Sequence, residues 1–418
     1  MKKQYILLFR AAVTVFLVFL GAYAGVPDRF SKAYAESQIR TTAFPSSVQP
    51  DQLCLTWSGD PATTQTVQWR TSPKVKKGYV EYKEKTAQTK DCIKKTAIRY
   101  DLENAGTSND PINHRFTAVL DGLTPGITYT YRAGSKKGWS EWAEFTTAPQ
   151  TTAPFSFIYV GDLQVGLDTW GLLLHAAYKL HPEAAFYMVA GDNVNRGNYR
   201  HEWDNLFHAA EGVFDRRTYV PALGNHDCKD GGPNLYLNLL TLPENSPKEI
   251  GPERTYCFNY GNALFLVLDS NSSVEKQRPW MEEQLKSTKA TWKFAMYHHP
   301  AYSSAPKRDN VDVREKWGSL FDQYHLDMAL QGHDHGYLRT KPMRAGKEAA
   351  SPAEGTIYVV SVSGTKHYDV GQFDYAAKTL DHLSTYQLLD IQTSPENKLT
   401  YRAYDIDGKM QDELVIMK

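Results

Sequence analysis

Cysteine is scarce in this chain, which has only four among its 418 residues. Their spacing matches no zinc-binding pattern, so a zinc site built on thiolates is not expected. Cys54 and Cys92 fall in one half of the chain, and Cys228 and Cys257 fall in the other. Two intradomain disulfides and four buried free thiols are both compatible with this arrangement. The first alternative predicts a bridge between Cys228 and Cys257.

An excess of charge of either sign is also missing. Lys+Arg and Asp+Glu both number 47, so the formal net charge is +0 at pH 7. No stripe of Lys and Arg appears along the chain, and a basic face is the least that nucleic-acid binding requires. We therefore expect no nucleic acid among the partners of this protein.

The N-terminus lacks an apolar run of the ~20 residues that a membrane span needs. Three basic residues, Lys2, Lys3 and Arg10, lie within the first ten positions, and a shorter apolar stretch follows at 11–24. Small residues then offer two cleavage positions, after Ala24 or after Ala35. We predict a signal peptide within 1–35, and a secreted or cell-envelope protein without a stable membrane span once the peptide is cleaved. A membrane anchor is the alternative.

Helical periodicity is absent from residues 38–149. Short segments such as 53–57, 66–70 and 115–120 place apolar side chains on one face with period two. Gly, Pro, Asn, Asp and Ser separate these segments, which is typical of strands joined by turns. The pattern predicts an all-β sandwich domain. No cluster of acids, bases or nucleophiles stands out in it.

The segment 123–131 of this domain resembles the turn-into-strand signature of fibronectin type III domains. In that family a tyrosine hydroxyl ties the strand to the preceding turn. Trp57 stands where such domains carry a core tryptophan. The resemblance implies a fibronectin-like sandwich, and residues 150–154 are expected to be a linker to the next domain.

From residue 155 to 418 the pattern changes to strand, loop and helix. Apolar runs predict strands at 155–160, 185–190, 219–223, 263–268, 292–297 and 326–330. Helical spacing follows the first strand at 167–177, and another helix is expected around 199–213. Alternating segments at 357–362, 386–391 and 399–403 suit a second sheet packed against the first. An α/β domain is therefore predicted.

Five of these strands end in polar residues of one kind. The ends read Gly-Asp-Leu-Gln (161–164), Gly-Asp-Asn-Val-Asn-Arg-Gly (191–197), Gly-Asn-His-Asp (224–227), His-His-Pro (298–300) and Gly-His-Asp-His (332–335). Each alone could be a turn, because Gly, Asn and Asp are ordinary turn formers. The carboxyl ends of strands in an α/β sheet converge on one crevice, so together they predict a site.

Carboxylate, amide and imidazole groups dominate this set, and sulfur is absent from it. Such ligands suit Mn, Fe or Zn better than Ca²⁺ or an iron–sulfur cluster. There are too many of them for one ion, and a carboxylate can bridge two ions held ~3.5–4 Å apart. The principal candidates are Asp162, Asp192, Asn225, His298, His333 and His335.

In order along the chain, these five blocks resemble those of the calcineurin-like metallophosphoesterases. With the preceding sandwich, the chain resembles the purple acid phosphatases. The resemblance implies two mixed β-sheets flanked by helices and a dinuclear metal centre. It makes Asp192 the bridging ligand. It assigns Asp162 and His335 to the first metal, and it assigns Asn225, His298 and His333 to the second.

The same resemblance suggests further roles. His226 would bind phosphate or protonate the leaving oxygen, or else orient a ligand. Arg196 would bind phosphate, unless it is a surface arginine, and His299 is a candidate for substrate contact.

Two positions depart from the pattern of the family. Asn195 stands where purple acid phosphatases have a tyrosine ligand, and Gln164 stands where other members have His or Gly. Both are retained as candidate metal ligands. The alternatives are that Asn195 orients His226 through its amide oxygen, as an aspartate does in related phosphoesterases, and that Gln164 only forms hydrogen bonds at the wall of the site.

We therefore predict an exported enzyme with two divalent ions (Mn, Fe or Zn) that hydrolyses small-molecule phosphomonoesters by attack of a metal-activated hydroxide. A phosphodiesterase or nucleotidase on the same metal core is the close alternative. A surface adhesion protein with a decayed catalytic domain is the alternative of another class, but none of the six principal ligands is lost. The sequence makes no prediction of the oligomeric state.

Overall fold

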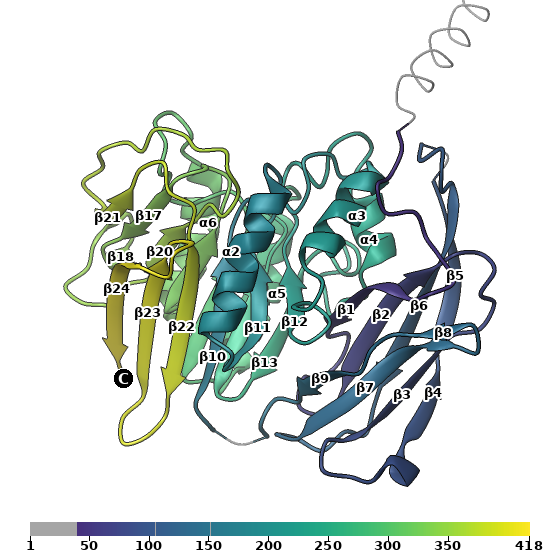
Figure 1. The fold of residues 1–418 in the computed structure, drawn as a ribbon. Helices are drawn as coiled ribbons and strands as arrows, with labels where there is room; N and C mark the ends of the chain where they lie inside the picture. The colour runs from purple at the N-terminus through teal and green to yellow at the C-terminus, as the bar shows by residue number, and fades with distance from the viewer. Residues whose placement is uncertain (1–39, 105, 151) are drawn as a thin grey trace, which may run out of the picture.

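The computed structural model describes residues 40–418, apart from residues 105 and 151. The predicted signal peptide at 1–35 lies outside the described residues. The chain forms a β-sandwich from its N-terminal part and a larger α/β domain from the rest (Figure 1). Across the residues that are described, no helix combines the length and the apolar character that crossing a membrane would take.

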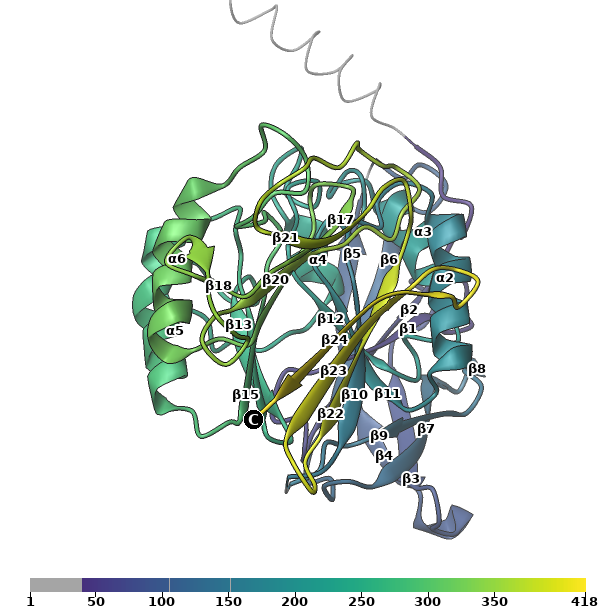
Figure 2. The same cartoon turned by 90° about the vertical axis from the view of Figure 1, so that its left-hand side faces the viewer.

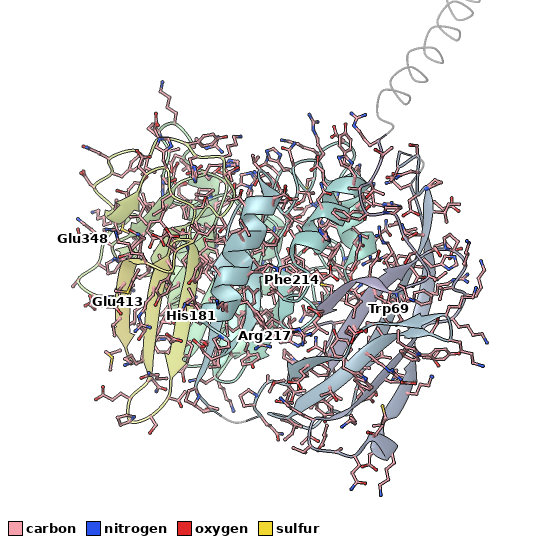
Figure 3. The ribbon with its side chains drawn as sticks, viewed as in Figure 1. Trp69, His181, Phe214, Arg217, Glu348 and Glu413 are labelled. Carbon is pink, nitrogen blue, oxygen red and sulfur yellow. The ribbon has the colours of Figure 1, made fainter. Side chains whose placement is uncertain are left out.

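The N-terminal domain consists of two facing antiparallel sheets. One contains, in spatial order, β1 (Asp51–Thr56), β2 (Gln65–Thr71), β6 (Ile112–Leu120) and β5 (Ile98–Glu103). The other contains β4 (Ile93–Thr96), β3 (Tyr79–Glu84), β7 (Thr128–Ser135) and β8 (Gly138–Trp139), with β9 (Ala143–Thr146) paired to β7. Trp69, labelled in Figure 3, is fully buried between them and stacks on Phe116. The predicted sandwich is confirmed.

One tyrosine and one tryptophan test the finer predictions for this domain. The hydroxyl of Tyr129 accepts a hydrogen bond from the amide of Thr124 at 2.9 Å, so the strand is tied to its preceding turn as expected. The expectation for Trp57 is wrong. Its indole packs against Phe186 and Phe258 of the second domain, with ring centroids 5.4 and 5.3 Å away. The reason is that β1 lies at the domain interface, and the core tryptophan of the sandwich is Trp69.

Two mixed sheets form the second domain. The first has the order β12 (Thr218–Pro221), β11 (Ala184–Val189), β10 (Phe155–Val160), β22 (Tyr386–Gln392), β23 (Lys398–Tyr404) and β24 (Met410–Met417). The second has the order β13 (Tyr256–Tyr260), β14 (Ala263–Val267), β15 (Trp292–Met296), β16 (Met328–Gln331), β20 (Ile357–Val360), β17 (Tyr337–Thr340) and β21 (Ala376–Leu380). A short hairpin, β18 (Met343–Arg344) and β19 (Lys347–Glu348), stands apart.

The C-terminal strands do not form a sheet of their own, so this prediction is wrong. β22 pairs antiparallel with β10 and extends the first sheet, whereas β20 pairs parallel with β16 and extends the second. Alternation of side chains identifies a strand but not its partner. The partner depends on which sheet edge remains open, and each sheet here has one edge that the tail covers.

Helices lie outside the paired sheets, as Figure 2 shows. α2 (Leu167–Leu180) and α3 (Arg200–Ala209) lie on one side, and α5 (Val274–Ser287) and α6 (Val311–Tyr324) pack on the second sheet. The short α4 (Asn234–Leu239) follows the third motif. Between the sheets, stacked aromatic rings fill the core. The rings of Phe157 and Phe186 are 5.0 Å apart, as are those of Phe265 and Phe294.

All four cysteines belong to the described residues, and all are free thiols. Cys54 and Cys257 are buried, whereas Cys92 and Cys228 are partly exposed. The predicted bridge between Cys228 and Cys257 is therefore not formed. Desolvation raises the pKa of the Cys54 and Cys257 thiols to about 12, so both remain protonated and act as small apolar groups.

Candidate metal centre

The candidate ligands project from one edge of the paired sheets. Each follows the carboxyl end of a parallel strand by a few residues: Asp162 follows β10, Asp192 follows β11, Asn225 follows β12, His298 follows β15, and His333 and His335 follow β16. All but Asn225 and His333 are fully buried. The ligand atoms of Asp162, Asp192 and His298 all lie within 4.8 Å of one another.

The backbone at these ligands is in an unusual conformation. Asp162, Asp192, His333 and His335 have φ values of 46°, 52°, 76° and 48°, in the left-handed region that non-glycine residues rarely adopt. Strain of this kind concentrates at functional sites, where the surroundings impose it. The neighbouring Gly224 has no space for a side chain, because a Cβ there would lie 2.0 Å from the amide nitrogen of Asp192.

One group of ligand atoms surrounds the Nε2 atom of His298. Asn225 Oδ1 lies 3.1 Å from it, His333 Nδ1 lies 3.2 Å from it, and Asp192 Oδ1 lies 3.3 Å from it. His333 Nδ1 is also 2.9 Å from Asn225 Oδ1. Ligands held about 2.0–2.2 Å from an ion, at angles between about 90° and the tetrahedral angle, are separated from each other by about 2.8–3.6 Å. These four atoms have that spacing.

A second group surrounds the Nε2 atom of His335. Asp162 Oδ2 lies 3.2 Å from it, and Gln164 Nε2 lies 3.1 Å from it. The same Gln164 nitrogen is 3.0 Å from Asp192 Oδ2. Turning the amide of Gln164 would present its oxygen at this position. Asp192 thus directs one oxygen to each group, which is the geometry of a bridging carboxylate.

The histidines are oriented by main-chain carbonyl groups. His298 Nδ1 lies 2.9 Å from Ala190 O, and His335 Nδ1 lies 2.9 Å from Lys366 O. With the proton of each ring on Nδ1, the lone pair of Nε2 faces the ligand groups. Such a bond fixes both the tautomer and the angle of a metal-binding imidazole.

The buried carboxylates and acceptor atoms of the site favour the binding of cations. Burial, with the neighbouring Asp192 adding to it, raises the pKa of Asp162 to about 8. Burial also lowers the pKa of His335 to about 4, which keeps its imidazole neutral as metal binding requires. Moreover, Asp162 Oδ2 and Gln164 Oε1 are buried without a hydrogen bond among the described residues. Divalent ions would neutralise the carboxylates and occupy these acceptors, so the donor set fits them.

His226 lies beside this centre. Its amide donates to Asp192 Oδ1 at 2.8 Å, and its Nε2 is 3.9 Å from Asp192 Oδ2. Its Nδ1 lies 2.8 Å from the main-chain oxygen of Asn195. Within the described chain, none of the hydrogen bonds of Asn195 uses its side-chain amide. The structure therefore places Asn195 as an orienting group for His226 and does not bring its side chain into either ligand group.

The two candidates for substrate contact have different surroundings. His299 lies at the edge of the centre, where its ring is 4.4 Å from that of His333 and its Nδ1 is 2.8 Å from the hydroxyl of Ser270. Burial lowers its pKa to about 3, so it is neutral. Arg196 has an exposed side chain and pairs with Asp230 at 3.1 Å. Its guanidinium is thus engaged by a carboxylate.

Sequence reasoning missed several residues of the site. The buried carboxylate of Asp227 accepts hydrogen bonds from the amide of Gly224 at 2.8 Å and from Asn193 Nδ2 at 2.9 Å, which joins the second and third motifs. Lys229 contacts His226, and Lys366 accepts from His335. Asp227 belongs to the third motif, although no role was assigned to it, and proximity to that motif could have identified Lys229. Lys366 stands far from every motif, so no local signal marks it.

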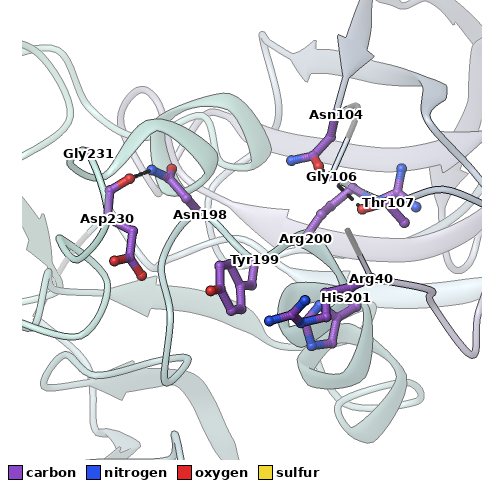
Figure 4. Close-up of a pocket in the computed structure, with 10 residues that line it drawn as sticks. All are labelled: Arg40, Asn104, Gly106, Thr107, Asn198, Tyr199, Arg200, His201, Asp230 and Gly231. Carbon is purple, nitrogen blue, oxygen red and sulfur yellow. Dashed lines mark hydrogen bonds between the residues drawn. The ribbon is translucent and has the colours of Figure 1, made fainter. Parts of the chain in front are cut away.

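A pocket of about 500 Å³ adjoins the loops that carry Asn195 and His226 (Figure 4). Asn198 and Tyr199 line it from the first loop, and Asp230 lines it from the second. Residues of the N-terminal domain close the other side, among them Asn104 and Thr107. None of the candidate metal ligands lines this pocket, so it is a neighbour of the metal centre and not the centre itself.

Comparisons with known proteins agree with both domains. Residues 50–147 match the family described as Purple acid Phosphatase, N-terminal domain, and residues 155–337 match the family described as Calcineurin-like phosphoesterase. An uncharacterised protein of Mycobacterium tuberculosis is 25% identical over 309 residues, which cover 62% of this chain and 57% of the relative. The chain thus spans less than two thirds of that relative's length. The Fe(3+)-Zn(2+) purple acid phosphatase 12 of Arabidopsis thaliana is 23% identical over 320 residues, covering 71% of this chain and 66% of that protein.

Solved structures show the same fold. A purple acid phosphatase from seeds of yellow lupin (Lupinus luteus) superimposes with a TM-score of 0.76 at 19% identity, covering 88% of this chain and 74% of that one. PhoD superimposes with a TM-score of 0.64 at 15% identity, covering 90% and 92%. Residues 155–337 therefore form a calcineurin-like phosphoesterase domain, preceded by a domain that matches the N-terminal domain of the purple acid phosphatases, and the chain shares the fold of the lupin enzyme.

Proposed function

We propose that this protein hydrolyses phosphomonoesters at a centre of two divalent metal ions. The observation that carries the proposal is the pair of ligand groups that share Asp192. One group is gathered around His298 and the other around His335. Two sites with one carboxylate between them match the short separation that two-metal hydrolysis needs.

When bound, the two ions supply Lewis-acid chemistry, because they polarise phosphoryl oxygens and acidify water. The protein would hold one ion through His298, His333 and Asn225 and the other through Asp162, His335 and Gln164, with Asp192 available to both. Divalent Mn, Fe or Zn fits this set of oxygen and nitrogen donors. The Arabidopsis relative is named for Fe(3+) and Zn(2+). For this chain we propose two divalent ions, because Asn195 has no phenolate.

His226 would donate a proton to the leaving group. Its Nδ1 is held by the carbonyl of Asn195, so Nε2 is the atom that faces the centre. In its doubly protonated form, with one proton on Nδ1 donated to the Asn195 carbonyl, His226 would pass the proton on Nε2 to the leaving oxygen as the bond to phosphorus breaks. The alcohol then departs neutral, and the neutral ring is left with Nε2 as an acceptor. Water supplies the oxygen that the phosphate retains.

We further propose that the protein is exported. The motive is the N-terminal stretch with basic residues, an apolar run and small-residue cleavage positions. Fractionation of cells that express the full chain, with N-terminal sequencing of the extracellular product, tests this. A full-length chain that stays in the cytoplasm would refute export.

The activity is tested by metal content measured alongside turnover. Full-length protein is loaded with Mn²⁺, Zn²⁺ or Fe²⁺ and assayed with 4-nitrophenyl phosphate and bis(4-nitrophenyl) phosphate. We expect two ions per chain and a higher kcat/KM for the monoester. A higher kcat/KM for the diester would favour a phosphodiesterase. Two bound ions without turnover of either ester would refute the proposal.

A further inference from the structure

Among the described residues, two lysines at the metal centre have no carboxylate partner. Lys229 stands on the loop after the third motif, and Lys366 stands on the loop between β20 and β21. Both side chains are half-buried. Neither forms an ion pair within the part of the chain that the structure describes. A half-buried ammonium group without a partner carries a desolvation cost that a bound anion would offset.

The ammonium group of Lys229 lies against His226. Its Nζ is 2.9 Å from both ring nitrogens. Since His226 Nδ1 is engaged by Asn195, Nε2 is the acceptor, and Lys229 keeps two further N–H donors. Burial lowers the pKa of Lys229, and the charge of Asp192 opposes this shift. His226 Nε2 is itself 3.9 Å from Asp192 Oδ2, so the ammonium group of Lys229 lies beside the carboxylate that the two ligand groups share.

Lys366 approaches from the side of His335. Its main-chain oxygen accepts from His335 Nδ1 at 2.9 Å, and its Nζ lies 5.0 Å from the ring centroid of Tyr368. The Tyr368 ring is itself 4.8 Å from that of His335. The charge of Lys366 lowers the pKa of both Lys229 and His335, although burial is the larger cause for each. Lys229 contacts His226, Lys366 contacts His335, and both histidines lie near Asp192 Oδ2, His226 directly and His335 through Gln164 Nε2, so the two lysines flank this part of the centre.

The arginines nearby differ, because each already has a carboxylate. Arg308 donates from Nε to Asp334 at 2.8 Å and from Nη2 to the carbonyl of His333 at 3.2 Å. Arg196 pairs with Asp230 at 3.1 Å. To bind a phosphate strongly, either guanidinium would have to leave its present partner. The two lysines need no such exchange.

We propose that Lys229 and Lys366 form a two-lysine clamp that binds the non-bridging phosphoryl oxygens and selects doubly charged phosphomonoesters over singly charged diesters. This inference rests on the proposed function and names its substrate class. A phosphomonoester carries nearly two negative charges at neutral pH, because its second pKa is ~6. A diester carries one, and its second ester group takes the place of one anionic oxygen. Two cations therefore discriminate by charge.

The test removes the charge of each lysine and keeps the length of its side chain. Lys229→Met, Lys366→Met and the double variant are prepared with the metals bound, and Lys229→Arg and Lys366→Arg retain the charge. Binding of orthophosphate by calorimetry gives a readout that is independent of turnover. The kcat/KM values for 4-nitrophenyl phosphate and bis(4-nitrophenyl) phosphate give the selectivity. Lys85→Met is the matched control, because Lys85 is an exposed lysine of the N-terminal domain that pairs with Glu144.

We expect each methionine variant to bind orthophosphate about ten- to hundredfold more weakly, since a charge-assisted hydrogen bond is lost. The kcat/KM for the monoester should fall by a similar factor, and that for the diester by less than about threefold. The arginine variants and Lys85→Met should retain most of the affinity for orthophosphate.

Several outcomes would overturn the clamp. Unchanged affinity for orthophosphate, an equal fall for both esters, or loss of metal from the methionine variants would each do so. Loss of metal would show that the lysines instead stabilise the metal centre. If the unaltered protein hydrolyses neither ester, the proposed function fails. Binding of orthophosphate that depends on the lysines would still support the clamp in that case.

Discussion

Arg70 of the N-terminal domain and Asp204 of α3 form an ion pair across the domain interface, with Nη1 and Oδ1 2.8 Å apart and side-chain exposures of 1% and 2%. Gln52 Nε2 also donates to Asp204 at 2.7 Å. Because α3 begins at Arg200, directly after the loop that carries Asn195, the first domain holds the helix that continues from the site. The sandwich therefore has a structural part in positioning His226.

Removing the cation of this pair should destabilise the protein. Arg70→Met leaves the Asp204 and Asp51 carboxylates without their shared partner, and breaking a buried pair typically costs about 3–5 kcal/mol. Urea unfolding, followed by fluorescence, should show a lower free energy of unfolding. Lys95→Met removes an exposed pair with Asp121 and should change this free energy by less than about 1 kcal/mol. Equal effects of the two substitutions would contradict the structural role of Arg70.

Replacing the shared carboxylate should empty the metal centre. Asp192→Asn removes the negative charge that both ligand groups use, and an amide cannot hold two divalent ions with the same strength. Elemental analysis should find fewer than two ions per chain, and turnover should be abolished. Asp369→Asn is the control, because Asp369 belongs to an exposed Asp–Asp–His group with metal-like spacing. Two ions and activity retained by Asp192→Asn would refute the bridging assignment.

Sequence reasoning succeeded where a rule of the fold determines the answer. The carboxyl ends of parallel strands meet at one edge, so the five motifs could be expected to gather, and the structure brings Asp162, Asp192, Asn225, His298 and the Gly-His-Asp-His histidines together. The strand at Phe155–Val160 was predicted with its exact bounds, because a continuous apolar run marks a strand buried on both faces.

Prediction from the sequence fails where contacts between residues far apart in the chain determine the structure. Alternation in the tail predicts a sheet of its own, because it does not reveal which edge of an existing sheet is open. Trp57 was assigned to the sandwich core, although its ring packs on Phe186 across the interface. Asn195 was considered only through its side chain, whereas it acts through its carbonyl, which every residue has. Lys366 is distant in sequence from every motif, and only the fold brings its main-chain oxygen to His335.

The absorption spectrum tests the absence of a tyrosinate ligand. Asn195 offers no phenolate, and Tyr199 lies in the wall of the neighbouring pocket (Figure 4). We therefore expect the protein with both metals bound to be colourless, and the protein stripped by a chelator to regain activity with Mn²⁺, Zn²⁺ or Fe²⁺. A strong visible band would contradict this expectation. Its loss in Tyr199→Phe, or in Tyr368→Phe beside His335, would identify the tyrosine responsible.

The role of His226 as a proton donor predicts a dependence on the leaving group. In His226→Ala the leaving oxygen departs without a proton, which costs little for 4-nitrophenolate and much for an alkoxide. We expect kcat for an alkyl phosphate to fall by about 10²–10⁴-fold and kcat for 4-nitrophenyl phosphate to fall much less. Metal content should stay at two ions per chain, because the ring is not a member of either ligand group. His201→Ala, on α3, is the matched histidine control and should leave the ratio of the two rates unchanged. An equal fall for both esters would show that the ring of His226 instead acts on Asp192, whose Oδ2 lies 3.9 Å from its Nε2.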